Sequence, residues 1–339
     1  MAIVLFCGAG VAALVSAHVY HLGVTRTLIA VLVGGVVPAG LYLTWMAGRL
    51  HPYAAGSPRL DMAAVADRLA LAVRVQWEAA VAAHRLNDPY PLPISWVAAD
   101  ASLTDGWDPL VTLATTGAGW PPPPPPGTWA ASPDDLAGEG GDLAGVLMRV
   151  PTGRLMVLGD PGAGKTMLMV RLVLDLLARR THGGPVPVLA SLASWNPANQ
   201  DLHGWLASQL VNDSPALAAA LPPGRGEVTG SCVAALLAAG LILPILDGLD
   251  EVPEALRGSA IVRINDALRP GEQIVVTCRT GQYRDAIRPM NGVGAILGTA
   301  AAVQLCPLDA GAVYRYLRED AGSPTAARWD PVLALLGTR

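Results

Sequence analysis

Residues 159–166 read Gly-Asp-Pro-Gly-Ala-Gly-Lys-Thr, and this run constrains the fold of the chain more than any other feature. An apolar run at residues 154–158 precedes it, which predicts a buried strand, and an apolar helix is expected to follow as far as Arg180. The spacing G-x-x-x-x-G-K-[ST] lets backbone amides curl around phosphate oxygens, and the N-terminus of the following helix adds its positive dipole end. The sequence therefore predicts a phosphate-binding loop within an α/β fold that has a parallel sheet flanked by helices.

Two side chains of this loop have specific expected contacts. Lys165 would reach the β and γ phosphates of a nucleoside triphosphate, and the Thr166 hydroxyl would ligate Mg²⁺. Lys165 is the single lysine among the 23 Lys and Arg residues, so we infer that its position requires a compact, flexible ammonium. The residues expected to bind the nucleotide are Gly159, Asp160, Pro161, Gly162, Ala163, Gly164, Lys165, Thr166 and Met167.

A second apolar run, residues 241–246, predicts another strand and ends at Asp247. An acid at the carboxyl end of such a strand lies where open α/β sheets bind ligands, so Asp247 is the predicted Mg²⁺ ligand beside Thr166. Asp250 and Glu251 follow one loop later, where a carboxylate could orient and deprotonate an attacking water. The alternative interpretation of these acids is a solvated surface turn.

A third strand is predicted at residues 273–278, and Arg279 follows at its carboxyl end. A guanidinium there can sense a γ phosphate through charge-assisted hydrogen bonds, so we place Arg279 with Asp250 and Glu251 among the candidate catalytic residues. The alternative interpretation is a surface salt bridge. Right-handed crossovers would bring the ends of all three strands to one edge of the sheet.

The N-terminal region contains two uncharged apolar runs, residues 2–20 and 28–47. Each is near the length of about 20 residues that spans a bilayer, which predicts two transmembrane helices and the lipid bilayer as a partner. One arginine, Arg26, lies between the runs, whereas two, Arg49 and Arg59, follow them. Because basic residues are more frequent on the cytoplasmic side, this difference favours both termini, and the phosphate-binding loop, on the cytoplasmic side of the cell membrane. A cleaved signal peptide is the alternative, but no basic residue precedes the first run.

The charged residues between 61 and 85 recur at spacings that keep them near one helical face, which predicts a stalk or packing helix of about 25 residues. Residues 94–115 give a mixed signal. A run of six prolines at 121–126 indicates a semi-rigid spacer, with a docking ligand as the alternative. The predicted division is a transmembrane hairpin at 1–50, a stalk and uncertain region at 51–115, a linker at 116–141, an NTPase domain at 142–308 and an incomplete helical lid at 309–339.

Composition excludes several classes of protein. With 52% apolar and 15% charged residues, the chain is too apolar to be intrinsically disordered. The net charge is −4 and no segment is strongly basic, so charge does not predict nucleic-acid binding. The four cysteines have neither C-x-x-C spacing nor a His partner at metal spacing, which excludes a disulfide scaffold and a zinc site. The strong preference for Arg over Lys is typical of a GC-rich genome, and we expect a bacterial source.

Three motifs together resemble the NACHT family of signal-transduction NTPases, within the STAND class. They are G-D-P-G-A-G-K-T, then L-I-L-P-I-L-D-G-L-D-E-V-P, then V-V-T-C-R, and the resemblance extends over about residues 142–320. It implies binding of ATP, or less often GTP, with Mg²⁺, and a homo-oligomer formed on activation by an unknown protein or ligand signal. By position it implies that Lys165 and Thr166 bind phosphate and Mg²⁺, that Asp247 binds Mg²⁺, that Asp250 and Glu251 support hydrolysis and that Arg279 is the first sensor.

The function predicted is a membrane-anchored signalling NTPase that switches oligomeric state with its nucleotide. One alternative is a nucleotide-holding membrane scaffold with negligible turnover, because the chain stops at Arg339 within what looks like an incomplete lid. Another is an energy-coupling ATPase of a membrane complex, which is disfavoured because the chain lacks an L-S-G-G-Q-like signature and polar residues in the apolar runs. A Ras-like GTPase is disfavoured because its N-K-x-D motif would need a second lysine.

Overall fold

The computed structural model describes the following parts of the chain: residues 61–83, 94–213, 232–288, 294–308, 310–320 and 330–336. Both apolar runs predicted to span a membrane lie outside these residues. Among the helices that are described, none has the length and apolar character needed to cross a bilayer.

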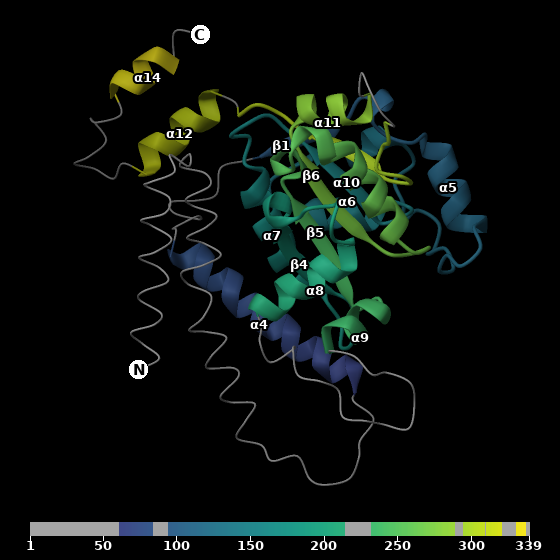
Figure 1. Cartoon of the computed structure of the whole chain (residues 1–339). Coiled ribbons are helices and arrows are strands. Elements are labelled where there is room, and N and C mark those ends of the chain that lie inside the picture. The colour runs from purple at the N-terminus through teal and green to yellow at the C-terminus, as the bar shows by residue number, and fades with distance from the viewer. Residues whose placement is uncertain are drawn as a thin grey trace, which may run out of the picture.

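The described residues build a seven-stranded, mostly parallel sheet with the order β2-β1-β7-β3-β6-β5-β4 (Figure 1). The strands are β1 (Ser95–Ala98), β2 (Gly138–Glu139), β3 (Arg154–Leu158), β4 (Val186–Ser191), β5 (Ile242–Asp247), β6 (Ile274–Cys278) and β7 (Ala301–Leu305). The five strands from β7 to β4 in this order pair in parallel, whereas β1 pairs antiparallel with both of its neighbours. The predicted α/β fold with a parallel sheet is confirmed.

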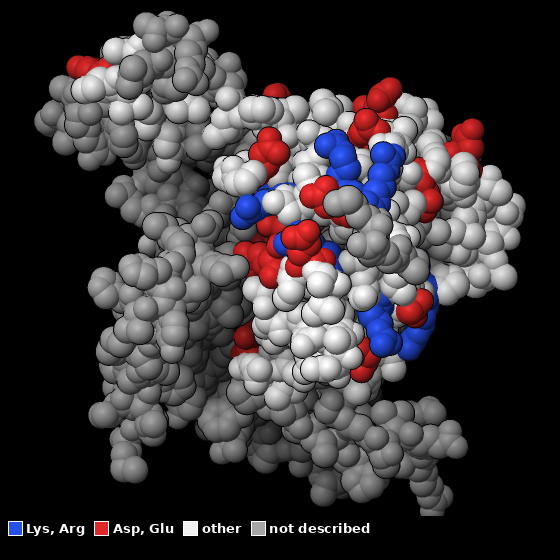
Figure 2. Space-filling model, turned by 45° about the horizontal axis from the view of Figure 1, so that its top comes forward, with Lys and Arg blue, Asp and Glu red and all other residues white. Residues whose placement is uncertain are grey.

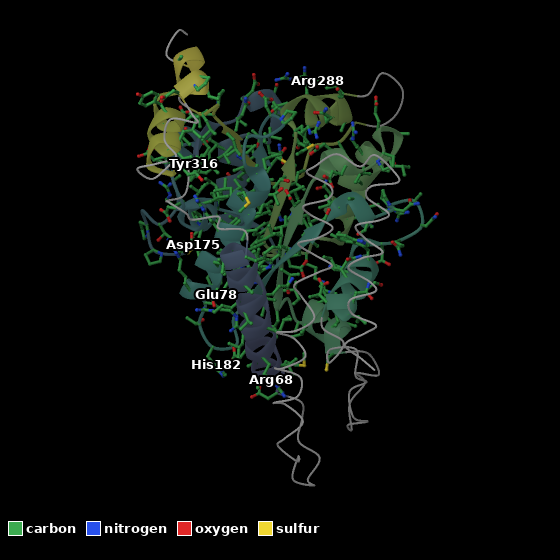
Figure 3. All side chains as sticks on the ribbon, turned by 90° about the vertical axis from the view of Figure 1, so that its left-hand side faces the viewer. Arg68, Glu78, Asp175, His182, Arg288 and Tyr316 are labelled. Carbon is green, nitrogen blue, oxygen red and sulfur yellow. The ribbon has the colours of Figure 1, made fainter. Side chains whose placement is uncertain are left out.

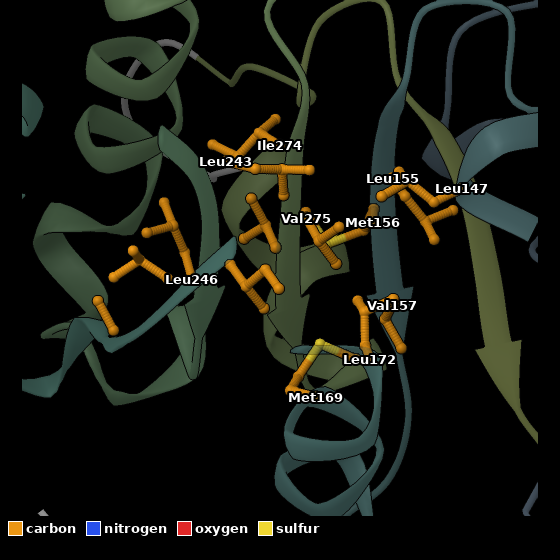
Figure 4. Close-up of a cluster of buried hydrophobic side chains, with 14 of the residues drawn as sticks. Leu147, Leu155, Met156, Val157, Met169, Leu172, Leu243, Leu246, Ile274 and Val275 are labelled. Atoms are coloured by element: carbon orange, nitrogen blue, oxygen red, sulfur yellow. The ribbon is translucent and has the colours of Figure 1, made fainter. Parts of the chain in front are cut away.

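The central strands have no polar face. Every residue of β3, β5 and β6 is buried, as expected for parallel strands that helices cover on both sides. Figure 4 shows part of this core, where Val157 of β3 lies close to Met169 and Leu172 of the following helix, and Leu155 lies close to Leu147. The continuous apolar runs seen in the sequence therefore reflect burial on two faces rather than a single amphipathic face.

Several helices contact one another, and α9 contacts both α8 and α4. Helix α7 follows the predicted phosphate-binding loop, and both α4 and α6 pack against it. Helix α10 packs against α8 and α11. Their bounds are α4 (Met62–Ala83), α5 (Trp107–Thr116), α6 (Leu143–Arg149), α7 (Lys165–Arg179), α8 (Leu202–Asp213), α9 (Cys232–Ala238), α10 (Glu254–Ala267), α11 (Thr280–Ile287), α12 (Ala310–Asp320) and α14 (Asp330–Leu336).

The helix predicted at residues 61–85 is α4, and it packs on the sheet domain. It contacts α7 and β4 and buries one stripe of apolar residues, which includes Leu69, Val73 and Trp77. One end is fixed by Asp67, which accepts a hydrogen bond from the Gly183 amide at 3.0 Å and forms an ion pair with Arg180 at 2.6 Å.

These bonds, with a further contact from His182, hold the pKa of Asp67 at about 2. Figure 3 shows Arg68 of α4 and His182 near the same end of this helix. The apolar stripe and the Asp67 contacts make α4 a packing helix, which was one of the two roles predicted for it.

Residues 94–141 differ from the predicted division, because they add two strands to the sheet. Trp96 of β1 is buried and donates a hydrogen bond from Nε1 to the Leu136 carbonyl at 2.9 Å. Beside the proline run, Trp120 lies 5.4 Å from the Arg154 guanidinium, a cation–π contact. The predicted boundary at residue 142 therefore falls within one packed unit, since β1 pairs with β7 and η2 (Pro133–Leu136) of the predicted linker also contacts β7.

Candidate functional site

The ends of β3, β5 and β6 bring the predicted site residues to one edge of the sheet. In the register of the parallel strands, Leu158 pairs with Cys278, so Gly159 and Arg279 follow at the same level. Asp247 is the last residue of β5, the next strand along. Helix α11, which follows β6, lies at the top of Figure 1, so this edge faces upward there.

The loop before α7 needs its glycines for two different reasons. Gly162 and Gly164 have φ angles of 79° and 87°, a left-handed conformation that side chains other than glycine rarely adopt. Neighbouring side chains also approach closely: a Cβ at Gly164 would lie 2.9 Å from Cδ1 of Ile94, and one at Gly159 would lie 3.1 Å from Cβ of Leu305. Larger residues at these positions would alter the curve of the loop.

Lys165 is the first residue of α7 and folds back over the loop. Its Nζ donates hydrogen bonds to the carbonyl of Gly159 at 2.7 Å and to that of Asp160 at 3.1 Å. Burial lowers the pKa of Lys165, while the nearby carboxylates of Asp250 and Asp247 act in the opposite direction. The ammonium is therefore held where the loop curves.

Thr166 and Asp247 meet directly. The Thr166 hydroxyl donates a hydrogen bond to Oδ2 of Asp247 at 2.7 Å, although 81 positions separate the two residues. Burial raises the pKa of Asp247, whereas hydrogen bonds from Thr277 and Thr166 oppose that shift. A hydroxyl and a carboxylate side by side are the hard oxygen donors that Mg²⁺ accepts, together with phosphate oxygens and water. The donor set therefore fits the predicted ion.

Sequence reasoning missed Thr277, which is fully buried in β6. Its hydroxyl donates to Oδ1 of Asp247 at 2.5 Å and accepts a hydrogen bond from the Gly248 amide at 2.9 Å. Both oxygens of Asp247 are thus oriented by threonine hydroxyls. A polar residue inside an otherwise apolar strand was the available signal, because a buried hydroxyl needs a partner.

Asp250 and Arg279 form one unit. Nε of Arg279 lies 2.7 Å from Oδ2 of Asp250, and the Arg279 backbone amide donates to Oδ1 at 3.1 Å. The Asp250 side chain is 8% exposed and the Arg279 side chain 43% exposed. Both carboxylate oxygens of Asp250 therefore have a contact to Arg279, and the guanidinium is oriented at the edge of the sheet where it was predicted.

Glu251 lies beside a residue that sequence reasoning did not select. Ser191, the last residue of β4, donates a hydrogen bond from its hydroxyl to Oε2 of Glu251 at 3.4 Å. Glu251 reaches this position because Gly248, with φ of 83°, turns the chain sharply after β5. No local pattern marked Ser191, since a serine at the end of an apolar strand is common.

The surface at this edge carries charge of both signs. Figure 2, in which the top of Figure 1 comes forward, shows basic and acidic side chains interspersed on the described surface, without a field of one sign. Long-range electrostatic attraction of an anionic ligand to this edge would need a large surface of positive potential. The binding chemistry of this edge therefore rests on the individual contacts described above.

Comparison with known proteins gives a family match. Residues 154–321 match the family model of the NACHT domain, and this segment includes Lys165, Asp247 and Arg279. The match supports a NACHT-family P-loop NTPase, which is a nucleotide-binding domain, at these residues. It begins at β3, later than the expected start at residue 142. No curated protein matches the chain.

Proposed function

We propose that this chain is a membrane-anchored signalling NTPase that binds ATP, or less often GTP, and changes its oligomeric state with the nucleotide. The observation that carries the proposal is the 2.7 Å hydrogen bond between Thr166 of the loop and Asp247 at the end of β5. It joins the phosphate-binding loop to the acid that the chemistry requires, at the edge of the sheet where Arg279 also lies.

The residues of the site divide the chemistry among them. The loop amides and Lys165 would bind the β and γ phosphates, and Thr166 and Asp247 would hold Mg²⁺ with two oxygens. When bound, that ion neutralises charge that develops on the phosphate oxygens. Glu251 is the carboxylate proposed to accept a proton from the attacking water, because Asp250 is paired with Arg279.

The switch would depend on Arg279. A guanidinium at this edge can contact a γ phosphate, which ATP has and ADP lacks, so its binding free energy differs between the two states. Slow turnover would then set the lifetime of the ATP state. A scaffold that holds nucleotide without turnover remains the second candidate, and Asp250 favours it because one of the two predicted hydrolytic acids is already paired.

The first test is nucleotide binding and turnover by the full chain. Lys165→Ala should abolish retention of ATP, whereas Arg263→Ala, a change on the exposed face of α10, should leave it intact. Wild-type retention of ATP by the lysine variant would refute the phosphate-loop assignment. Binding of ATP without Mg²⁺-dependent phosphate release would favour the scaffold, and competition with GTP would rank the two nucleotides.

The membrane and oligomer parts of the proposal need separate measurements. A cysteine placed at Gly23 should react with an impermeant reagent outside intact cells, and one placed at Gly56 should not. The reverse pattern would separate the domain from cytoplasmic ATP and contradict the proposal. Light scattering of the full chain should show a larger assembly with ATP than with ADP, and identical masses in the two nucleotides would contradict the switch.

A further inference from the structure

Ser191 at the end of β4 is a polar residue of this edge that the proposed function does not use. In the register of the parallel pair β4 and β5, Ser191 lies directly beside Asp247. Its hydroxyl donates to Glu251 at 3.4 Å. A side chain from the strand next to the metal-binding acid therefore contacts the neighbouring carboxylate.

The Ser191 hydroxyl takes part in two hydrogen bonds. Its oxygen accepts a hydrogen bond from the backbone amide of Ala193 at 3.3 Å, in the first turn of η3 (Leu192–Ser194). A hydroxyl has one proton to donate. Because the Ser191 oxygen accepts from the Ala193 amide, its own proton can be donated to Oε2 of Glu251. The turn after β4 thus presents a donor to the carboxylate.

The other side of Glu251 is bounded by Gly248. A Cβ at Gly248 would lie 3.1 Å from Cγ and Cδ of Glu251 and 3.3 Å from its Oε2. The Glu251 backbone amide also donates to the Gly248 carbonyl at 2.9 Å, which closes the turn of η5 (Leu249–Glu251). A side chain at position 248 would therefore press on the Glu251 carboxylate and would also be strained at the φ of 83° that Gly248 adopts.

We propose that Ser191 is a positioning residue that holds the Glu251 carboxylate beside Asp247, so that Glu251 can accept a proton from the attacking water. This inference rests on the proposed function and assigns the hydrolytic step within it. Both oxygens of Asp250 already contact Arg279, so we assign that step to Glu251 instead. Ser191 acts through Glu251 and does not itself touch the nucleotide.

The test separates turnover from binding in the full chain with MgATP. Ser191→Ala should lower kcat about 10-fold or more, because a hydrogen bond to a charged group is lost, while ATP affinity stays unchanged. Ser191→Thr keeps the hydroxyl and should restore most of the turnover. Ser208→Ala removes a comparable hydroxyl from the exposed face of α8 and should match the wild type.

A double variant shows whether Ser191 works through Glu251. In a Glu251→Gln background, Ser191→Ala should cause no further loss of turnover, because the acceptor of its hydrogen bond has already been changed. Wild-type turnover by Ser191→Ala, or an equal loss of ATP affinity and kcat, would overturn the inference. Failure of the wild type to bind or hydrolyse ATP would refute the proposed function instead.

Discussion

Arg279 contacts Asp250 twice, through its guanidinium at 2.7 Å and through its backbone amide at 3.1 Å. The two residues were selected for different reasons, one as a sensor of the γ phosphate and the other as a hydrolytic acid. Their pairing orients a half-exposed guanidinium with a buried carboxylate. A change at either residue should therefore alter the position of the other.

Changing Arg279 should weaken ATP binding more than ADP binding. For Arg279→Ala we expect a difference of about 1 to 3 kcal/mol between the two nucleotides, the range for a charge-assisted hydrogen bond. Asp250→Asn should reduce the same difference, because the guanidinium loses its ionic partner. Titration calorimetry measures both, with the exposed Arg284→Ala of α11 as control. Equal losses for ATP and ADP would make Arg279 a structural residue.

Changing Asp247 should remove the effect of Mg²⁺ rather than the binding of nucleotide. An Asn side chain still accepts one hydrogen bond from Thr166 or Thr277 but lacks the negative charge that binds the ion. ATP affinity of Asp247→Asn should therefore be the same with Mg²⁺ and with a chelator, whereas the exposed Asp266→Asn should keep the wild-type response. Full enhancement by Mg²⁺ in the Asp247 variant would contradict the metal assignment.

The response of the wild type to Mg²⁺ should depend on pH. Because burial raises the pKa of Asp247, its carboxylate stays protonated to a higher pH than that of an exposed aspartate. The enhancement of ATP affinity by Mg²⁺ should therefore increase as the pH rises through this raised pKa, and calorimetry at several pH values measures it. An enhancement independent of pH would show that Asp247 is ionised throughout.

Arg154 should matter for stability and not for nucleotide binding. At the start of β3, far from the loop, it donates hydrogen bonds to the carbonyls of Glu272 and Arg269 and to the Thr299 hydroxyl. Arg154→Ala should lower the free energy of unfolding by about 2 to 4 kcal/mol, because three acceptors lose a charged donor. Urea denaturation measures this, and Arg263→Ala should change it by no more than about 0.5 kcal/mol. A similarly small change for Arg154→Ala would contradict the role.

Asp213 should make stability depend on pH. It is the last residue of α8 and lines a small cavity together with Leu69 and Trp77, and burial raises its pKa to about 6 from the 3.8 of an ordinary aspartate. The folded state then binds the Asp213 proton more tightly than the unfolded state. The contribution of this proton to the free energy of unfolding is therefore complete below pH 3.8 and is lost as the pH rises through about 6.

The variant Asp213→Asn lacks this titration. Its free energy of unfolding should exceed that of the wild type by about 1 to 3 kcal/mol above pH 7, with the difference shrinking toward pH 4. Denaturation at a series of pH values measures the difference, and Asp266→Asn serves as the exposed control. A difference that stays constant with pH would exclude Asp213 as its source.

The sequence by itself determined the parts of the site that depend on local pattern. The loop at 159–166 and the strands before it and before Asp247 and Arg279 were predicted because an apolar run and a fixed glycine spacing are readable within a short window. Since parallel strands end at a common edge, their proximity followed as well. The packing of α4 was predicted only as one of two roles.

Tertiary structure decided which side chains share a partner. Thr277 orients Asp247 from 30 positions away, and Ser191 contacts Glu251 from 60 positions away, because the sheet order places β6 and β4 on either side of β5. Strand β1 joins the sheet antiparallel to β7, about 200 positions later in the chain, which no window of residues 94–115 could show. Hydrogen bonds of this kind depend on strand order and register, and these are set by the packing of the whole domain.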